Sequence, residues 1–183
     1  MAILLKDAMM PNLVQTLEGN PAIIHTGPFA NIAHGTNSIV ATDIARKYSD
    51  FVVIEAGFAS DLGAEKFFNL VSRTKGMEPP DAVVIVSTLK AVKFHGGASV
   101  KNLGAPDREA LIKGFENLKG HIENMRAFGR DVFVALNRYE NDTDEEIRLL
   151  KNLVSEANSE CYETTVWADG GNGALELAEA VSK

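Results

Sequence analysis

The chain has 183 residues, of which 45% are hydrophobic and 23% are charged, and its formal net charge is -7 at pH 7. This length supports one substantial domain with its own core, and an acidic chain with scattered lysines lacks the clustered basic face that nucleic-acid binding requires. A single cysteine, Cys161, excludes an internal disulfide and a thiolate metal centre, and no apolar run reaches the about 20 residues of a membrane span, so we expect a cytoplasmic protein without a membrane partner.

The first expected element is a leading helical region over residues 1–20, with a kink or break at Pro11. Five apolar runs predict strands, and four of them are rich in Val, Ile and Phe without clean alternation. Such runs are typical of strands buried on both faces of a parallel sheet, whereas the last run is more polar and is expected at an edge. The runs are "PAIIHT", "FVVIEAG", "DAVVIVST", "DVFVALN" and "CYETTVW", which begin at 21, 51, 81, 131 and 161.

Helical patterns separate these strands. The clearest is an apolar stripe over residues 107–128, which Pro106 and Asp107 begin and Gly129 ends. Further helices are expected at 38–48, at 62–72, after the capping-box sequence "TDEE" at 143–146, and in "GALELAEAVSK". The alternation predicts an α/β fold, a three-layer, mostly parallel, doubly wound sheet of about five strands with flanking helices. Ligands of such sheets bind beyond the carboxyl ends of the strands.

The loop "EAGFASDLG" offers two carboxylates, Glu55 and Asp61, on either side of a glycine hinge. Carboxylates at a strand end can hold Mg²⁺, and the glycines would let backbone N–H groups approach a phosphate. An ordinary turn in which Asp61 caps the following helix explains the same residues equally well.

The loop "KAVKFHGGA" places two lysines, the second of them Lys93, and His95 beside the paired glycines Gly96 and Gly97. Lysine supplies a point charge for a phosphate or carboxylate, and the glycines let the backbone come close. A solvated loop is the more ordinary interpretation of these lysines. The histidines show no metal-binding spacing, so no zinc site is predicted.

Two later loops contain planar side chains that could contact a planar ligand. Asn137 follows the strand "DVFVAL" and could pair with the edge of a base, and Tyr139 could stack on a ring, although both suit a turn as well. Trp167 lies in the glycine-rich "WADGGNG", either as a wall for a planar ligand or as a lid on the core. The predicted order of strands and helices is like that of P-loop NTPases. The chain has no GxxxxGK[ST] sequence, however, so it lacks the phosphate loop of that class.

Longer motifs make the assignment specific. The stretch "LLKDAMMPNLVQTLEGNPAIIHTGPFANIAHGTNS", followed by "EAGFASDLGAEKFF", "KFHGG" and "WADGGNGALELAE", closely resembles formate–tetrahydrofolate ligase, also called 10-formyltetrahydrofolate synthetase. The resemblance covers essentially all of residues 1–183 as a single α/β segment. The family's chain is much longer, and its phosphate loop lies in an N-terminal part that this sequence does not contain. The resemblance therefore implies an internal segment of a larger, usually homo-oligomeric enzyme.

The resemblance implies ATP, Mg²⁺, formate and tetrahydrofolate as cofactor and substrates. ATP would phosphorylate formate, and tetrahydrofolate would attack the formyl phosphate. Glu55 and Asp61 match a loop facing the phosphates and metal, and Asn31 and His34 in "GPFANIAHG" would supply polar contacts beside the reaction centre. The remaining expected ligand-binding residues are Phe58, Lys93, His95, Gly96, Gly97, Asn137, Tyr139 and Trp167.

Tyr139 and Glu140 stand where the family usually has Phe-Pro, so the aromatic plane is kept while a turn proline is lost. We expect the isolated chain to be inactive because it has no phosphate loop. The alternative is a non-catalytic α/β module that binds nucleotide or folate.

Overall fold

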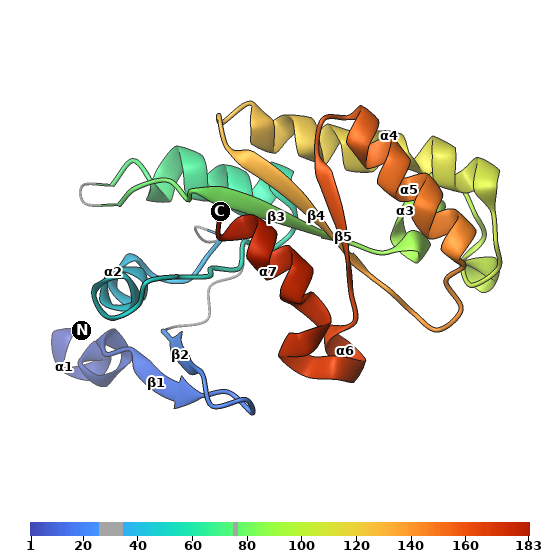
Figure 1. Ribbon diagram of the computed structural model, residues 1–183. Helices are drawn as coiled ribbons and strands as arrows, with labels where there is room; N and C mark the ends of the chain where they lie inside the picture. Colours follow the sequence, from blue (N-terminus) through green and yellow to red (C-terminus); the bar gives the residue numbers. More distant parts are fainter. Residues whose placement is uncertain (26–34, 75–76) are drawn as a thin grey trace. The chain divides into compact units, whose positions relative to one another are not determined.

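The computed structural model describes residues 1–25, 35–74 and 77–183 (Figure 1). Its internal contacts divide the chain into two compact units, Met1–Pro79 and Pro80–Lys183. Each unit is described by itself below. Among the described residues, no helix combines the length and the apolar character needed to cross a membrane.

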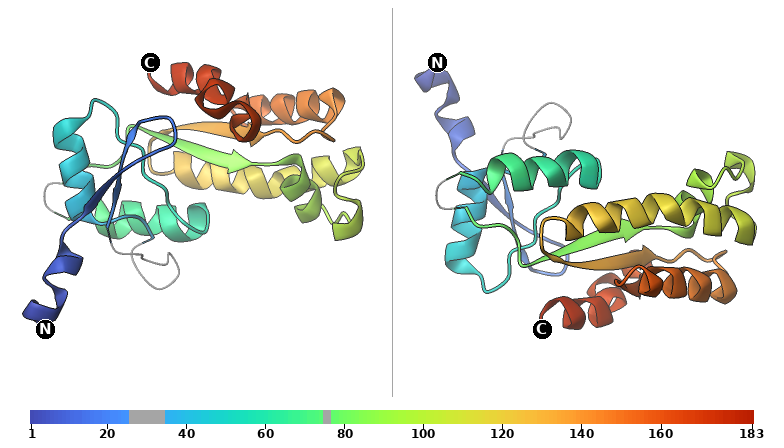
Figure 2. Two further views of the ribbon diagram at one scale, coloured as in Figure 1. Left: turned by 90° about the horizontal axis from the view of Figure 1, so that it is seen from below. Right: turned by 90° about the horizontal axis from the view of Figure 1, so that it is seen from above.

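The unit Pro80–Lys183 is built on a parallel sheet with the strand order β3-β4-β5. Its strands are β3 (Ala82–Ser87), β4 (Asp131–Asn137) and β5 (Glu160–Thr164). Its helices are α3 (Leu89–His95), η4 (Val100–Asn102), α4 (Arg108–Arg126), α5 (Asp144–Glu156), α6 (Val166–Asp169), η5 (Gly170–Ala174) and α7 (Leu175–Val181). In both views of Figure 2, α4 covers one face of the sheet while α5 and α7 cover the other. The predicted α/β class with a parallel sheet between helical layers is confirmed.

Local sequence signals set the boundaries of the two long helices. The Asp107 carboxylate accepts a hydrogen bond from the Ala110 N–H at 2.9 Å, which satisfies a free donor at the start of α4. Thr143 Oγ1 accepts one from the Glu146 N–H at 3.3 Å and begins α5 in the same way. Past the end of α4, Gly129 has a φ of +74°, a conformation that costs glycine little. These ends agree with the prediction from sequence.

Helices α3 and α4 touch through two glycines. A Cβ atom on Gly96 would lie 1.8 Å from the Ala110 carbonyl oxygen, and one on Gly114 would lie 1.8 Å from the Val92 carbonyl oxygen. Backbone meets backbone here, so no larger residue fits without moving a helix. The contact fixes α3 against α4 just after β3.

The unit Met1–Pro79 contains an antiparallel hairpin and short helical segments. These elements are α1 (Ala2–Leu5), η1 (Asp7–Met9), β1 (Asn12–Gln15), β2 (Pro21–Ile24), α2 (Ile39–Tyr48) and the π-helical turns η2 (Ser60–Ala64) and η3 (Phe67–Val71). A small cluster of Phe67, Val71 and Met77 forms its core. The helices predicted at 38–48 and 62–72 correspond to α2 and to the segment from η2 to η3.

The helical prediction for residues 1–20 is wrong beyond Pro11, where β1 begins instead. Within the loop between β1 and β2, the Thr16 N–H donates to the Asn20 carbonyl oxygen at 2.9 Å and Gly19 has a φ of +84°. This tight turn joins β1 to β2, and pairing across a hairpin outweighs the weak helical pattern of the sequence.

The number of strands in the parallel sheet also differs from the prediction. Three of the five predicted strands form it, whereas β2 pairs antiparallel with β1. The run at 51–56 forms no strand with any part of the chain that the structure describes. An apolar run needs a neighbouring backbone to become a strand, and sequence pattern alone does not supply one.

Candidate functional site

The carboxyl ends of β4 and β5 meet at one edge of the sheet, where Asn137 is in register with Thr164. Thr164 Oγ1 donates a hydrogen bond to Asn137 Oδ1 at 2.6 Å, and the Arg138 N–H donates to the Thr164 carbonyl oxygen at 3.0 Å. These bonds hold the amide of Asn137 in a fixed orientation. Its Nδ2 group has no hydrogen bond to any residue that the structure describes.

Tyr139 lies in the loop after β4, and hydrogen bonds between Tyr139 and Asp142 close this loop. The Tyr139 N–H donates to the buried Asp142 carboxylate at 2.9 Å, and the Asp142 N–H donates to the Tyr139 carbonyl oxygen at 3.0 Å. The Tyr139 side chain is 42% exposed, and the Lys90 ammonium lies 4.2 Å from the centre of its ring. The structure therefore places Asn137 and Tyr139 at the carboxyl edge, as predicted.

Trp167 lies in α6, just beyond β5, and is 87% exposed. The Thr165 N–H donates to the Gly173 carbonyl oxygen at 2.9 Å, and a Cβ on Gly173 would lie 2.5 Å from the Thr165 carbonyl carbon. The glycine-rich stretch thus packs against the start of α6. Within this chain, the alternative that Trp167 is a core lid is wrong.

Charged side chains surround the same edge. Arg138 forms ion pairs with Asp144 at 2.6 Å and Glu163 at 3.0 Å, and Lys151 reaches Glu163 at 2.6 Å. The hydrogen bond from Lys151, with a smaller contribution from Arg138, lowers the pKa of Glu163. The bonds to Asp144 and Glu163 raise the pKa of Arg138. No sequence motif indicated this network, because its members come from the loop after β4, from α5 and from β5.

Lys93 lies in the protein interior, where its side chain is 1% exposed. Its ammonium donates to Glu146 Oε2 at 3.2 Å and to the Ala105 carbonyl oxygen at 2.9 Å. Glu146 Oε1 in turn accepts the Asp107 N–H at 2.8 Å. The structure thus gives Lys93 a buried ion pair rather than the solvated position considered from sequence, and two of its three donors are already used.

The prediction of a loop at "KAVKFHGGA" is wrong for Lys90 to His95, which lie in α3, and the end of this segment divides between packing and solvent. Gly96 is buried at the α3–α4 contact, whereas His95 is exposed and Gly97 has a φ of +95° with open space around its Cα. The geometry therefore gives a packing role to Gly96, and a ligand contact at His95 or Gly97 stays a prediction.

Cys161 is half-buried on β5. Burial raises the pKa of its thiol to about 11, so the side chain is a neutral thiol at pH 7. A nucleophilic cysteine needs the opposite shift. The interpretation of Cys161 as part of the strand's packing agrees with this environment.

The other candidate residues lie in the unit Met1–Pro79, around a contact of three glycines. The Gly57 N–H donates to the Gly35 carbonyl oxygen at 2.9 Å, and the Gly63 N–H donates to the Gly57 carbonyl oxygen at 2.9 Å. A Cβ on Gly63 would lie 2.1 Å from the Gly57 carbonyl oxygen. Phe58 and Ala59 continue this loop with φ values of 61° and 64°, which residues with side chains rarely adopt.

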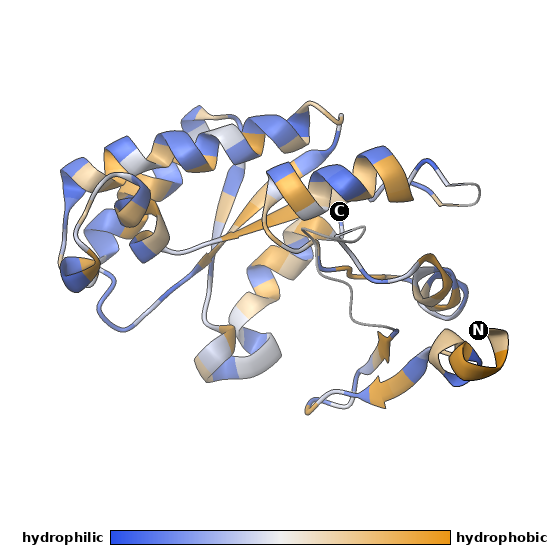
Figure 3. Cartoon of the chain, turned by 180° about the vertical axis from the view of Figure 1, so that it is seen from behind, coloured by the Kyte–Doolittle hydropathy of each residue, from blue (hydrophilic) through white to orange (hydrophobic). Residues whose placement is uncertain are grey.

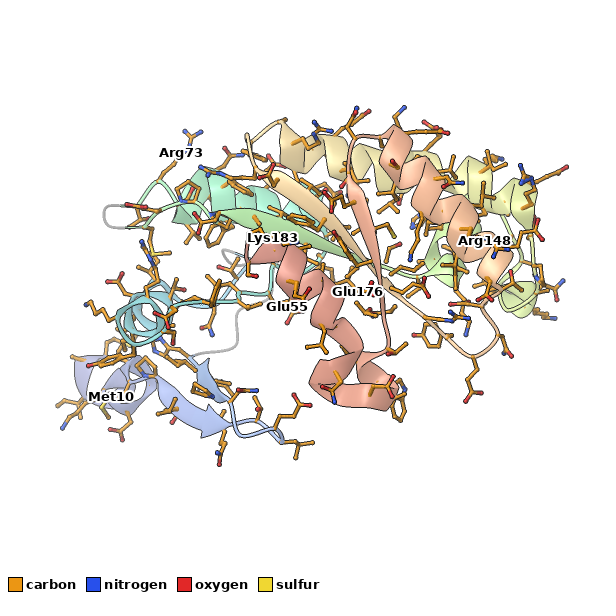
Figure 4. The ribbon with its side chains drawn as sticks, in the orientation of Figure 1. Met10, Glu55, Arg73, Arg148, Glu176 and Lys183 are labelled. Carbon is orange, nitrogen blue, oxygen red and sulfur yellow. The ribbon has the colours of Figure 1, made fainter. Side chains whose placement is uncertain are left out.

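Glu55, Phe58 and Asp61 are all exposed on this loop, and Figure 4 labels Glu55. Asp61 makes no capping hydrogen bond at the start of η2, so the alternative that it is a helix cap is wrong. Asn31 and His34 lie outside the described residues. Among the residues that are described, no group of three or more acidic, histidine or cysteine side chains could hold a metal ion.

Comparison with known proteins gives a consistent result. The model of the family described as formate–tetrahydrofolate ligase matches residues 1–183. A curated protein of that name from Granulibacter bethesdensis is 54% identical, and one from Thermotoga maritima is 52% identical. Both matches cover the whole of this chain, but only 32% and 34% of the length of the two relatives. In Fervidobacterium nodosum the identity is 55% over 181 residues, or 98% of this chain and 32% of the relative. The chain thus spans about a third of the length of these relatives.

Proposed function

Because the chain belongs to the formate–tetrahydrofolate ligase family, we propose that it is part of an ATP-dependent ligase that joins formate to tetrahydrofolate. In this reaction ATP transfers its terminal phosphoryl group to formate, giving formyl phosphate and ADP. The N10 amine of tetrahydrofolate attacks the formyl carbon and loses its proton as phosphate departs. The products are 10-formyltetrahydrofolate, ADP and phosphate.

One observation carries this chain's part in the proposal. Tyr139 and Trp167 follow the carboxyl ends of two neighbouring, paired strands, and both rings are exposed. In an α/β sheet this edge is where ligands bind, and flat aromatic side chains suit the faces of planar heterocycles. We assign to this edge the ring of folate or of the nucleotide.

Asn137 supports the same assignment. The Thr164 hydroxyl donates a hydrogen bond to Asn137 Oδ1 and thereby orients the amide. The Nδ2 group would then donate to the edge of a bound ring, which gives orientation in addition to stacking. His95 and Gly97 remain candidate contacts in the neighbouring loop after β3.

The phosphates and Mg²⁺ need other groups. Glu55 and Asp61 are exposed carboxylates, and Mg²⁺ typically binds one or two carboxylates together with substrate phosphates and water, so these residues fit the metal. When bound, Mg²⁺ would neutralise charge on the transferred phosphoryl group. Phe58, on the same loop, is proposed to add to the wall of the site, and Asn31 and His34 are proposed as polar contacts beside it.

Lys93 does not fit a role as the phosphate cation, because Glu146 neutralises it in the interior. The chain also has no GxxxxGK[ST] phosphate loop. We therefore propose that another part of the larger enzyme supplies the phosphate loop, that this enzyme is a homo-oligomer, and that the 183-residue chain alone is inactive.

A segment exchange tests the proposal. The matching third of the Thermotoga maritima relative is replaced by this chain, and formation of 10-formyltetrahydrofolate is measured with formate, ATP and Mg²⁺. We expect the chimera to be active and the isolated chain to be inactive. An inactive but folded chimera would contradict the proposal. If the isolated chain nevertheless bound tetrahydrofolate, that result would favour the non-catalytic binding module.

Single substitutions in the chimera then test the edge. Tyr139→Leu is expected to raise the KM for tetrahydrofolate about fivefold, since stacking on an aromatic ring contributes about 1 kcal/mol. Tyr48→Leu is the control, because Tyr48 is also an exposed tyrosine, at 85%, but lies at the end of α2. An equal effect of the two substitutions would remove Tyr139 from the site.

A further inference from the structure

Lys90, at the start of α3 after β3, lies close to Tyr139 in the loop that follows β4. The Lys90 ammonium lies 4.2 Å from the centre of the Tyr139 ring, a distance at which a cation is attracted to an aromatic face. Lys90 has no ion pair with any carboxylate that the structure describes. Its charge is therefore directed at the ring without a neutralising partner.

The helix that carries Lys90 has a fixed position. Lys93, one turn later on α3, is held by the buried pair with Glu146 on α5. Gly96 and Gly114 lock α3 against α4 by backbone contact. These contacts hold the backbone that carries Lys90 in place against α4 and α5.

The Tyr139 loop is equally constrained. Two hydrogen bonds with Asp142 close it, one accepted by the Asp142 carboxylate and one donated by the Asp142 N–H, and Asp142 itself is buried. Arg138 is held on the adjacent side by Asp144 and Glu163. The Lys90 ammonium lies over one face of this ring, and Tyr139 as a whole is 42% exposed to solvent.

We propose that Lys90 is a positioning and specificity-determining residue, which occupies one face of Tyr139 and leaves the opposite face as the stacking surface for a planar, electron-rich heterocycle. The assignment of that heterocycle to folate rests on the proposed function. A cation on one face draws π-electron density toward itself, so the opposite face attracts an electron-rich, amino-substituted ring more strongly. Lys90 thus acts through Tyr139 rather than by contact with the ligand.

The test uses the chimera described above. Lys90→Gln is expected to raise the KM for tetrahydrofolate by about three- to fivefold, the size of a partly exposed cation–π interaction, with kcat and the KM for formate unchanged. Lys90→Arg keeps the cation and should restore the KM. Lys101→Gln removes an exposed lysine from η4 in the same connection and serves as the control. Urea midpoints of all variants should agree.

A double-mutant cycle isolates the action through the ring. In a Tyr139→Leu background, Lys90→Gln should have no further effect, whereas Tyr139→Phe, which keeps the ring, should preserve the full effect. An equal rise in KM with and without the ring would overturn the proposal, because Lys90 would then contact the ligand itself.

Equilibrium dialysis of tetrahydrofolate against the same variants gives a readout independent of turnover. An active chimera whose folate affinity is unaffected by Lys90→Gln would overturn the role of Lys90 alone. A folded chimera that neither reacts nor binds tetrahydrofolate would overturn the proposed function, and the folate assignment of this surface with it.

Discussion

The two units of the chain differ in how completely each buries its own apolar residues. In Pro80–Lys183, helices cover both faces of the sheet, and side chains such as Leu111 and Leu136 are completely buried. In Met1–Pro79, Ile3 and Leu4 are 92% and 83% exposed. Figure 3 shows the hydrophobic colour both along the enclosed strands and on the open N-terminal segment. Apolar content alone therefore does not make a core.

The difference follows from connectivity. Each strand of the parallel sheet is followed by a helix that returns across the sheet, so consecutive elements cover one another. The hairpin of β1 and β2 has no such cover, and every residue of β1 is exposed. A two-stranded hairpin is marginally stable by itself. We expect the two units to respond very differently to truncation and substitution.

The largest effect is expected from separating the units. Residues 80–183, expressed alone, should unfold cooperatively in urea because they contain most of the buried apolar side chains. Residues 1–79 alone should give a broad transition of low amplitude. Circular dichroism at increasing urea measures both. Cooperative unfolding of residues 1–79 would show that this unit is stable by itself despite its exposed apolar surface. That result would contradict the expected difference in stability between the two units.

The buried ion pair gives the next largest effect. Lys93→Met leaves the Glu146 carboxylate buried without its cation, and we expect a loss of about 3–5 kcal/mol in the free energy of unfolding. Replacing both residues, Lys93→Met with Glu146→Leu, should recover most of this loss. Lys119→Met is the control, since its pair with Glu123 is exposed and contributes less than about 1 kcal/mol. Equal losses for Lys93 and Lys119 would mean that the pair is not buried in solution.

Glycine-to-alanine substitutions on α4 should change the free energy of unfolding in opposite directions, depending on whether the glycine contacts α3. Gly114→Ala should cost about 3 kcal/mol, because its Cβ would collide with the Val92 carbonyl oxygen at 1.8 Å. Gly120→Ala, on the same helix with open space around it, should stabilise by about 0.5–1 kcal/mol. Thermal unfolding of both variants measures the difference. A neutral Gly114→Ala would indicate that α3 can move away from α4.

The smallest effect is expected from Glu163 at acid pH. Because Lys151 and Arg138 lower its pKa, the carboxylate stabilises the folded state above its unfolded pKa of about 4.3 and loses this effect as pH falls through the lower folded pKa. Glu163→Gln should lower the free energy of unfolding at pH 7 by less than about 1 kcal/mol, and this difference should shrink as the pH falls below about 4.

The control for this prediction is Glu156→Gln at the exposed end of α5. It should leave the acid limb of the stability curve unchanged. If the free energy of unfolding of Glu163→Gln fell with decreasing pH in the same way as that of the wild type, the bonds from Arg138 and Lys151 would not persist in solution.

Much of the unit Pro80–Lys183 could be predicted from local signals. Asp107 and Thr143 mark helix starts because a side-chain oxygen must satisfy a free N–H there, and Gly129 marks an end because it accepts a positive φ. The rule that parallel strands place ligand-binding loops at their carboxyl ends located Asn137 and Tyr139 correctly at the edge.

Other features could not be predicted because they depend on partners distant in sequence. The burial of Lys93 requires Glu146, which lies 53 residues further along the chain. The run at 51–56 has a strand-like composition but no pairing partner among the described residues. Residues after Pro11 favour helix weakly, and only pairing with β2 makes them a strand.

The sequence by itself determined the family, the α/β class and the ends of the long helices, because these depend on long identities and on interactions within a few residues. The tertiary structure alone decided which charges are buried and which aromatic faces are open. Lys90 and Lys93 are three residues apart, yet one lies over an exposed ring and the other is sealed in an ion pair. That distinction arises from the side of α3 on which each lies and from what α5 and the loop after β4 place opposite it.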